Sequence, residues 1–199
     1  MENMDIQVVI RLNQLWRTIY PHLAQWISQW CPTKTGWVLE LGPFSGGISR
    51  VLMIQLPDLK TVCLISQDKV ARTVKNQFES SFETVVGPLD SLPFGVFFDV
   101  VIFRGALFFL TPAIIREIYR VLKPGAYGLL GGGYGPLTPT EEISEIAEES
   151  KRLNYRLGKK WISKGERKEM VKGAGMERCA QIIEDGGLWL LLKKNSHPG

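Results

Sequence analysis

The chain has 199 residues, of which 45% are hydrophobic and 22% charged, and its net charge is +4. This balance is typical of one soluble globular domain with a core of ordinary size. No apolar run reaches the ~20 residues that a membrane-spanning helix needs. The acidic start, residues 1–5, lacks the basic segment of a signal peptide. The mild positive charge allows anionic partners without requiring nucleic acid.

The cysteines give no sign of a disulfide framework or a metal site. Cys31, Cys63 and Cys179 lie far apart without a Cys-x-x-Cys spacing, and His22 and His197 are isolated. We therefore expect a reduced, cytoplasmic protein without a metal ion.

The N-terminal segment predicts two helices or one kinked helix. Apolar residues recur at helical spacing over residues 6–30, and Pro21 interrupts the pattern. The segment is rich in large aromatic residues, among them Trp16 and Tyr20. These two residues are candidates for substrate contacts if the helices form a lid, because aromatic rings suit flat ligands and cations. The alternative is ordinary packing against the edge of a sheet.

The segment 36–47 predicts a buried strand, a glycine-rich turn and the start of a helix. Trp37, Val38 and Leu39 form the strand, Glu40 lies at its carboxyl end, and Gly42 opens the turn. Glycine lets the backbone approach a ligand closely, and free amide groups at a helix start attract anionic groups. We therefore expect this turn to hold a cofactor that contains a nucleoside.

Strands and helical segments alternate through the rest of the chain. Further strands are expected at residues 61–66, 84–87, 98–103 and 127–130, with helices at residues 48–56, 68–79 and 111–122. A helix over residues 138–157 is inserted after the fifth strand, where it would lie over an acceptor pocket. The capping box Ser163-Lys164-Gly165-Glu166 begins the last helix. Residues 180–183 and 188–192 predict a hairpin.

This order predicts an α/β fold: a Rossmann-like, doubly wound and mostly parallel sheet that ends in a C-terminal antiparallel hairpin. We expect a single domain over residues 1–199 in four parts. They are an N-terminal helical cap (1–32), a cofactor-binding core (36–133), a helical insertion with the final helix (134–176) and the hairpin (178–194).

Three stretches, in this order, resemble class I S-adenosylmethionine-dependent methyltransferases. The likeness is greatest to the small-molecule group that includes quinone and sterol methyltransferases. The stretches are residues 38–46, with an acid and spaced glycines, residues 90–101 around the fourth strand, and residues 120–127 before the fifth strand. The resemblance implies S-adenosylmethionine as cofactor and S-adenosylhomocysteine as product.

The resemblance also assigns positions around this cofactor. The turn after the first strand surrounds the methionine part, the ends of the second and third strands hold ribose and adenine, and the end of the fourth strand meets the acceptor. The cofactor-binding candidates are Glu40, Gly42, Pro43, Phe44, Gly46, Ser66, Gln67, Leu89, Asp90, Arg104 and Gly105. Two positions depart from the family pattern: Ser66 and Gln67 replace the acid expected on the ribose, and Pro88 replaces an aspartate near the adenine.

Methyl transfer from a sulfonium depends mainly on positioning, so no catalytic triad is expected. Tyr134, which follows the fifth strand in a glycine-rich stretch, is the candidate catalytic residue; its alternative role is packing under the next helix. We expect a small-molecule acceptor, anionic or aromatic. A basic stretch over residues 151–172 has few aromatic residues, which makes nucleic acid unlikely as a partner. The oligomeric state stays open.

Two other functions compete with this hypothesis. A catalytically silent protein of the same fold, acting as a binding or sensor protein, would explain the departures at Ser66 and Pro88. A nicotinamide-dependent dehydrogenase needs a Gly-x-Gly-x-x-Gly turn and an acid after the second strand, and the chain has neither.

Overall fold

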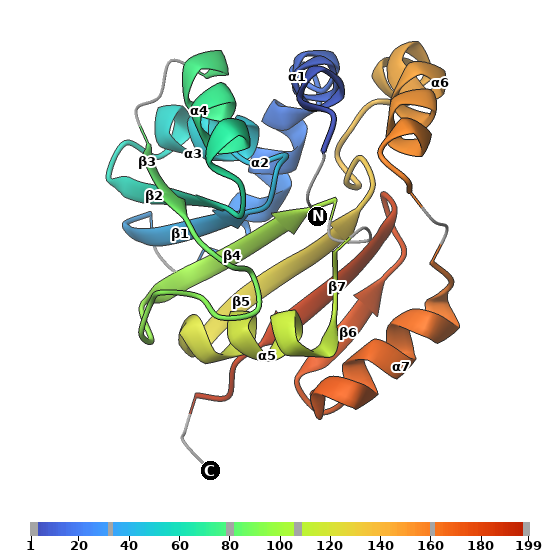
Figure 1. Cartoon of the computed structure of the whole chain (residues 1–199). Coiled ribbons are helices and arrows are strands. Elements are labelled where there is room, and N and C mark those ends of the chain that lie inside the picture. Colours follow the sequence, from blue (N-terminus) through green and yellow to red (C-terminus); the bar gives the residue numbers. More distant parts are fainter. Residues whose placement is uncertain (1–3, 32–33, 79–81, 106–108, 160–161, 197–199) are drawn as a thin grey trace.

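The computed structural model describes residues 4–31, 34–78, 82–105, 109–159 and 162–196 (Figure 1). Within these residues one seven-stranded sheet has the order β3-β2-β1-β4-β5-β7-β6. The strands are β1 (Gly36–Leu41), β2 (Leu59–Ile65), β3 (Glu83–Val86), β4 (Phe98–Arg104), β5 (Leu122–Gly132), β6 (Ala180–Ile183) and β7 (Leu188–Lys193). The first five pair in parallel, whereas β7 is antiparallel to both β5 and β6. The predicted fold class is confirmed.

Helices cover both faces of this sheet (Figure 1). They are α1 (Ile6–Leu15), α2 (Tyr20–Ser28), α3 (Gly47–Gln55), α4 (Asp68–Gln77), α5 (Pro112–Val121), α6 (Thr140–Arg156) and α7 (Lys164–Ala174). One apolar core lies between the sheet and α1 to α4, with contributions from α6, and a second lies between the sheet and the pair α5 and α7.

The alternation of side chains along each strand explains why the sequence shows continuous apolar runs. In β1, Val38 packs in the first core and Leu39 in the second. In β4, Val100 and Val101 divide in the same way. A strand that is buried on both faces therefore has no polar side to show in its sequence.

The element boundaries agree with the sequence in most places and differ in two. The helix expected over residues 111–122 ends at Val121, and β5 begins at once at Leu122 because the backbone there pairs with Phe98 of β4. The helix expected over residues 138–157 begins at Thr140, after Pro139, and has no side-chain cap. The capping box of Ser163 and Glu166 at the start of α7 is confirmed.

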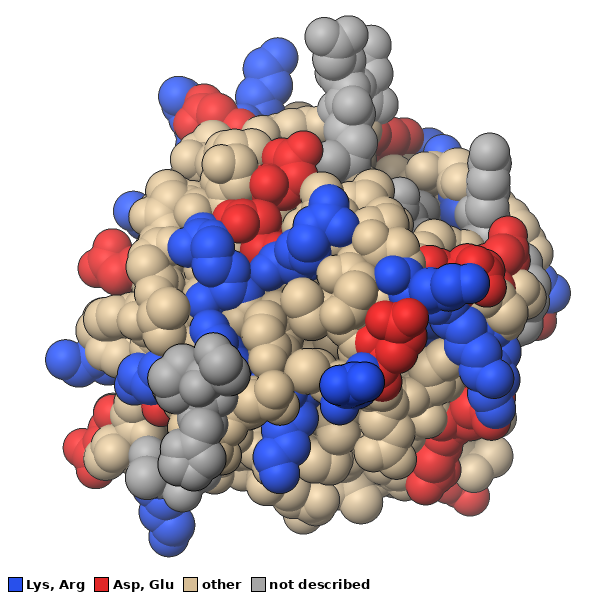
Figure 2. All heavy atoms as spheres, turned by 90° about the horizontal axis from the view of Figure 1, so that it is seen from below, with Lys and Arg blue, Asp and Glu red and all other residues tan. Residues whose placement is uncertain are grey.

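Two surface properties bear on partners. Among the described residues, no helix is both long enough and apolar enough to cross a membrane. On the face seen in Figure 2, basic side chains are interspersed with acidic and uncharged ones. This mixture gives that face no continuous basic band of the kind that a nucleic-acid backbone requires.

Candidate functional site

The site lies where the strand order reverses. The chain proceeds from β1 outward to β2 and β3 and then returns to β4 on the other side of β1. Ligands of open α/β sheets bind at such a switch point, beyond the carboxyl ends of the strands. Here the turn after β1 faces the end of β4, which brings Gly42 to Gly46 close to Arg104 and Gly105.

Glu40 is fully buried and binds the start of α3. Its carboxylate oxygen Oε2 accepts hydrogen bonds from the backbone N–H groups of Gly46 and Ser49, both at 2.9 Å. The first N–H groups of a helix have no partner within the helix, and a negative charge there is favoured by the helix dipole. Burial raises the pKa of Glu40, and the hydrogen bonds from Ser49 and Gly46 oppose that shift.

This arrangement closes the helix terminus to an external phosphate. The carboxylate of Glu40 already occupies it, and the Tyr20 ring lies so close that a Cβ on Gly47 would stand 2.2 Å from it. A dinucleotide needs that terminus for its pyrophosphate. The geometry therefore argues against a nicotinamide-dependent dehydrogenase.

Arg104, the last residue of β4, holds the turn and the N-terminal helices together. Its Nη2 lies 2.9 Å from Asn13 Oδ1, 2.9 Å from Tyr20 Oη and 3.0 Å from the carbonyl oxygen of Phe44. The guanidinium carbon lies 4.7 Å from the Trp16 ring, and the rings of Tyr20 and Phe44 are also close to it. Aromatic faces stabilise a desolvated cation, which suits a guanidinium that is only 4% exposed.

Two buried side-chain atoms of Glu40 and Arg104 have no hydrogen-bond partner among the described residues. Glu40 Oε1 and Arg104 Nε are buried and make no hydrogen bond in the described structure. One is an acceptor and the other a donor, which are the complements of an ammonium and a carboxylate. Buried polar atoms without partners are costly, and a ligand that reaches them would recover that cost.

Phe44 closes the space in front of Arg104. Its side chain is 2% exposed, and its ring lies against Gly105, where an added Cβ would stand 2.5 Å from it. Gly105 also has a φ of +70°, so a glycine is favoured there on two grounds. The cavity left between Phe44, Arg104 and Trp16 has a volume of about 40 Å³.

On one side of Phe44 lies an open cleft of about 1070 Å³, at the ends of β2 and β3. Four of the residues predicted from the sequence line it: Ser66, Gln67, Leu89 and Asp90. Leu89 is buried and Asp90 exposed, which gives the cleft an apolar floor and a polar rim. Phe109 and Ile114 line it as well, although no sequence motif pointed to either residue as part of a site.

On the other side lies a pocket of about 360 Å³ between α1, α6 and the ends of β5 and β7; we call it the acceptor pocket, after the role proposed for it below. Trp16 and Tyr134 stack in it with ring centroids 4.9 Å apart. The Trp16 indole N–H donates to the hydroxyl of Ser150 at 2.9 Å. Further residues line the acceptor pocket that no sequence motif pointed to: Ile143, Ala147, Asn154, Lys159 and Leu188.

Comparison with known proteins agrees with this geometry. Residues 39–130 match the family model described as "Methyltransferase domain".

This segment is a methyltransferase domain.

Solved structures share the fold of the whole chain. A protein from Methanococcus maripaludis assigned to the S-adenosyl-L-methionine-dependent methyltransferases is 21% identical, with a TM-score of 0.76 over 100% of this chain and 97% of that one. A Haloferax volcanii protein in complex with the Trm112 methyltransferase activator is 15% identical, with a TM-score of 0.69 over 99% and 100%. Human N-acetylserotonin methyltransferase in complex with S-adenosylmethionine is 18% identical, with a TM-score of 0.63 over 96% and 55%. No curated protein sequence matches the chain.

The cofactor of this family fits the methyltransferase domain at both ends, but Phe44 stands between them. The open cleft accepts a nucleoside, and the orphaned atoms of Glu40 and Arg104 complement an amino-acid group. The cavity of about 40 Å³ at Phe44 is too small for the methionine part. A methionine group placed in that cavity would have to displace the Phe44 side chain.

The structure places Tyr20 away from any open ligand surface. Tyr20 is 2% exposed, and its hydroxyl accepts a hydrogen bond from Arg104. Its position therefore does not support its predicted role as a substrate contact. Trp16 and Tyr134 line the acceptor pocket and keep their predicted roles as candidates. Burial raises the pKa of Tyr134, so less of the phenolate that could accept a proton is present.

We predict that Glu40→Ala destabilises the methyltransferase domain by about 2 kcal/mol, because two helix N–H groups lose their acceptor. Urea-induced unfolding measures the free-energy change. Glu145→Ala, on the exposed face of α6, is the control. Equal free energies of unfolding for the two variants would contradict the capping role.

We predict that Phe44→Ala binds S-adenosylhomocysteine about tenfold more tightly than the wild type, because no side chain has to be displaced; tenfold corresponds to about 1.4 kcal/mol. Adenosine affinity should stay unchanged. Calorimetry measures both affinities, and circular dichroism confirms folding, since truncation of a buried Phe costs about 3–5 kcal/mol of stability. Weaker binding of S-adenosylhomocysteine by the folded variant would show that Phe44 supports the cofactor rather than blocks it.

Proposed function

We propose that the chain transfers a methyl group from S-adenosylmethionine to a small molecule held in the acceptor pocket. The observation that carries this proposal is the arrangement of two cavities on either side of Phe44 and Gly105. One is open and suits a nucleoside; the other is partly enclosed and about 360 Å³ in volume, the size of a small organic molecule.

The residues of the chain contribute by binding and orientation. Leu89 offers an apolar surface to the adenine, while Ser66 and Gln67 offer hydrogen bonds to the ribose hydroxyls. Glu40 and Arg104 offer their orphaned atoms to the amino-acid part. The bound cofactor supplies an electrophilic methyl group.

The residues of the acceptor pocket also contribute by binding and orientation. Tyr134, which stacks on the nearly buried Trp16, offers an aromatic ring that orients a flat acceptor, and α6 and the β6–β7 turn line the rest of the pocket. Holding two reactants in line can lower a barrier by ~7–11 kcal/mol in favourable models. Because the phenol of Tyr134 has a raised pKa, its role in this proposal is contact with the acceptor rather than proton removal.

Phe44 also favours a second candidate function. A methyltransferase-fold protein that binds nucleosides without catalysis would keep the open cleft. It would also fill the space at Phe44 between the cleft and the acceptor pocket, as this chain does. Calorimetry with S-adenosylmethionine, S-adenosylhomocysteine and adenosine separates the two functions. Binding of adenosine alone at millimolar concentrations would overturn the enzymatic proposal, and binding of all three would support it. A cytoplasmic location stays a prediction.

The neutral end of β2 leads to a further prediction. Ser66→Asp places a carboxylate at the ribose end of the cleft, and hydrogen bonds to a charged acceptor are about twice as strong as neutral ones. We expect S-adenosylhomocysteine to bind about five to tenfold more tightly, a gain of about 1 kcal/mol.

The control ligand is the dideoxyadenosine that lacks both ribose hydroxyls, whose affinity should not rise. A gain for both ligands, or for neither, would show that Ser66 does not face the ribose.

A further inference from the structure

The acceptor pocket is charged, and its charge has one sign. Among the described residues that line it, Lys151 and Lys159 are the charged ones, and no carboxylate lines it. Glu148 lies near enough to raise the pKa of Tyr134, but it lines the neighbouring exposed groove together with Lys151 and Arg152. The interior of the pocket is therefore positive.

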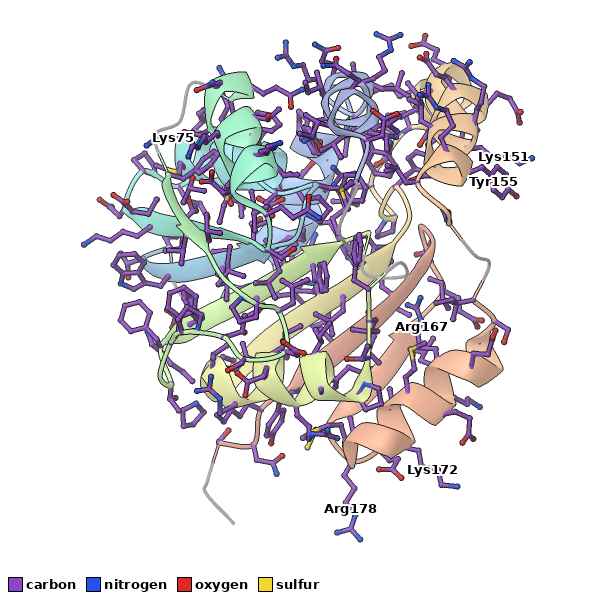
Figure 3. All side chains as sticks on the ribbon, viewed as in Figure 1. Lys75, Lys151, Tyr155, Arg167, Lys172 and Arg178 are labelled. Atoms are coloured by element: carbon purple, nitrogen blue, oxygen red, sulfur yellow. The ribbon has the colours of Figure 1, made fainter. Side chains whose placement is uncertain are left out.

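Lys159 lies deeper than Lys151. It lines both the acceptor pocket and the small cavity beside Phe44 and Arg104, which places it where the two meet. Lys151 lies on the outer side of α6, where Figure 3 shows it pointing away from the sheet beside Tyr155. Lys151 is exposed, whereas Lys159 is half-buried.

The ammonium of Lys159 has no hydrogen-bond or ion-pair partner in the part of the chain that the structure describes. Other lysines are paired: Lys123 binds Asp99 at 2.8 Å, and Lys164 binds Glu184 at 2.6 Å. Burial lowers the pKa of Lys159, the direction expected for a cation that lacks a counter-ion. An unpaired charge in a partly buried site costs free energy that a bound anion would recover.

A second cation lies behind the pocket wall. Arg167 of α7 is fully buried and donates through Nη1 to the carbonyl oxygen of Leu188, a lining residue, at 2.7 Å. Its Nε and Nη2 have no partner among the described groups, and burial lowers its pKa to about 10. Figure 3 shows Arg167 directed from α7 toward the upper end of the sheet. It strengthens the positive field near the pocket.

The walls define the shape of the ligand. Trp16 and Tyr134 stack with their planes 15° apart, and Ser150 fixes the indole through its N–H. The Asn154 side-chain amide also donates to the Ser150 hydroxyl at 3.4 Å. These polar side chains therefore bind one another within the pocket wall. Ile143 and Ala147 complete an apolar surface. A ligand with a flat ring matches this surface. An acidic group on that ligand would have the Lys159 ammonium as its ion-pair partner.

We propose that the acceptor is a flat, largely apolar organic anion that packs against the Tyr134 ring and places its acidic group on the ammonium of Lys159. This inference rests on the proposed function, because it identifies the pocket as the acceptor site. It narrows the substrate class from small molecules in general to aromatic acids.

Two fluorescent probes test the proposal without any cofactor. Anilinonaphthalene sulfonate is an aromatic anion, and phenylnaphthylamine has the same rings without the sulfonate. We expect the wild type to bind the anion about tenfold more tightly than the neutral probe. Lys159→Met should remove that preference, and Lys159→Arg should restore most of it. Lys168→Met, on the exposed face of α7, is the matched control and should behave as the wild type.

Equal affinities of the wild type for the two probes would overturn the proposal. So would an unchanged preference in Lys159→Met, because the anion would then bind elsewhere. Calorimetry with S-adenosylhomocysteine on the same proteins keeps this test separate from the proposed function. If S-adenosylhomocysteine binds and the probe preference is absent, the methyltransferase proposal stands and the anion site fails; the reverse result leaves the anion site and removes the enzymatic role.

Discussion

The buried charge of Arg104 is the constraint on which the site depends. An arginine side chain that is 4% exposed needs acceptors and polarisable neighbours in place of water, and its hydrogen bonds reach Asn13 in α1, Tyr20 in α2 and the turn after β1. These three segments must therefore meet at the end of β4. The N-terminal helices thereby become a wall of the site, although the family model matches only residues 39–130.

Glu40 provides the second fixed point on the same turn. Its bonds to Gly46 and Ser49 set the direction of α3, while Arg104 sets the position of Phe44. The two side chains have opposite charges, and the positive charge of Arg104 opposes the rise in the pKa of Glu40 that burial causes. The short turn between β1 and α3 is therefore held from both ends, which explains how a glycine-rich segment keeps one conformation.

The sequence predicted those parts of the site whose residues lie close together along the chain. The strand, turn and helix around Glu40 follow from apolar alternation and glycine spacing, and Ser66 and Leu89 reach one cleft because parallel strands end at one edge. The partners of Arg104 lie 91 and 84 residues away along the chain, and no local pattern identifies them. Lys159 appeared only as one member of a basic stretch, because burial and the absence of a partner are properties of the fold.

Trp16 connects the two halves of the site physically. It contacts the Arg104 guanidinium on the cofactor side and stacks with Tyr134 in the acceptor pocket. A cofactor that displaces the Phe44 side chain removes the ring that lies against the Arg104 guanidinium, and the guanidinium must then adjust against the Trp16 ring. The shape of the acceptor pocket therefore depends on whether the passage at Phe44 is open. Because binding linkage is reciprocal, any effect of a bound cofactor on the affinity of this pocket for its ligand has an equal counterpart in the affinity for the cofactor.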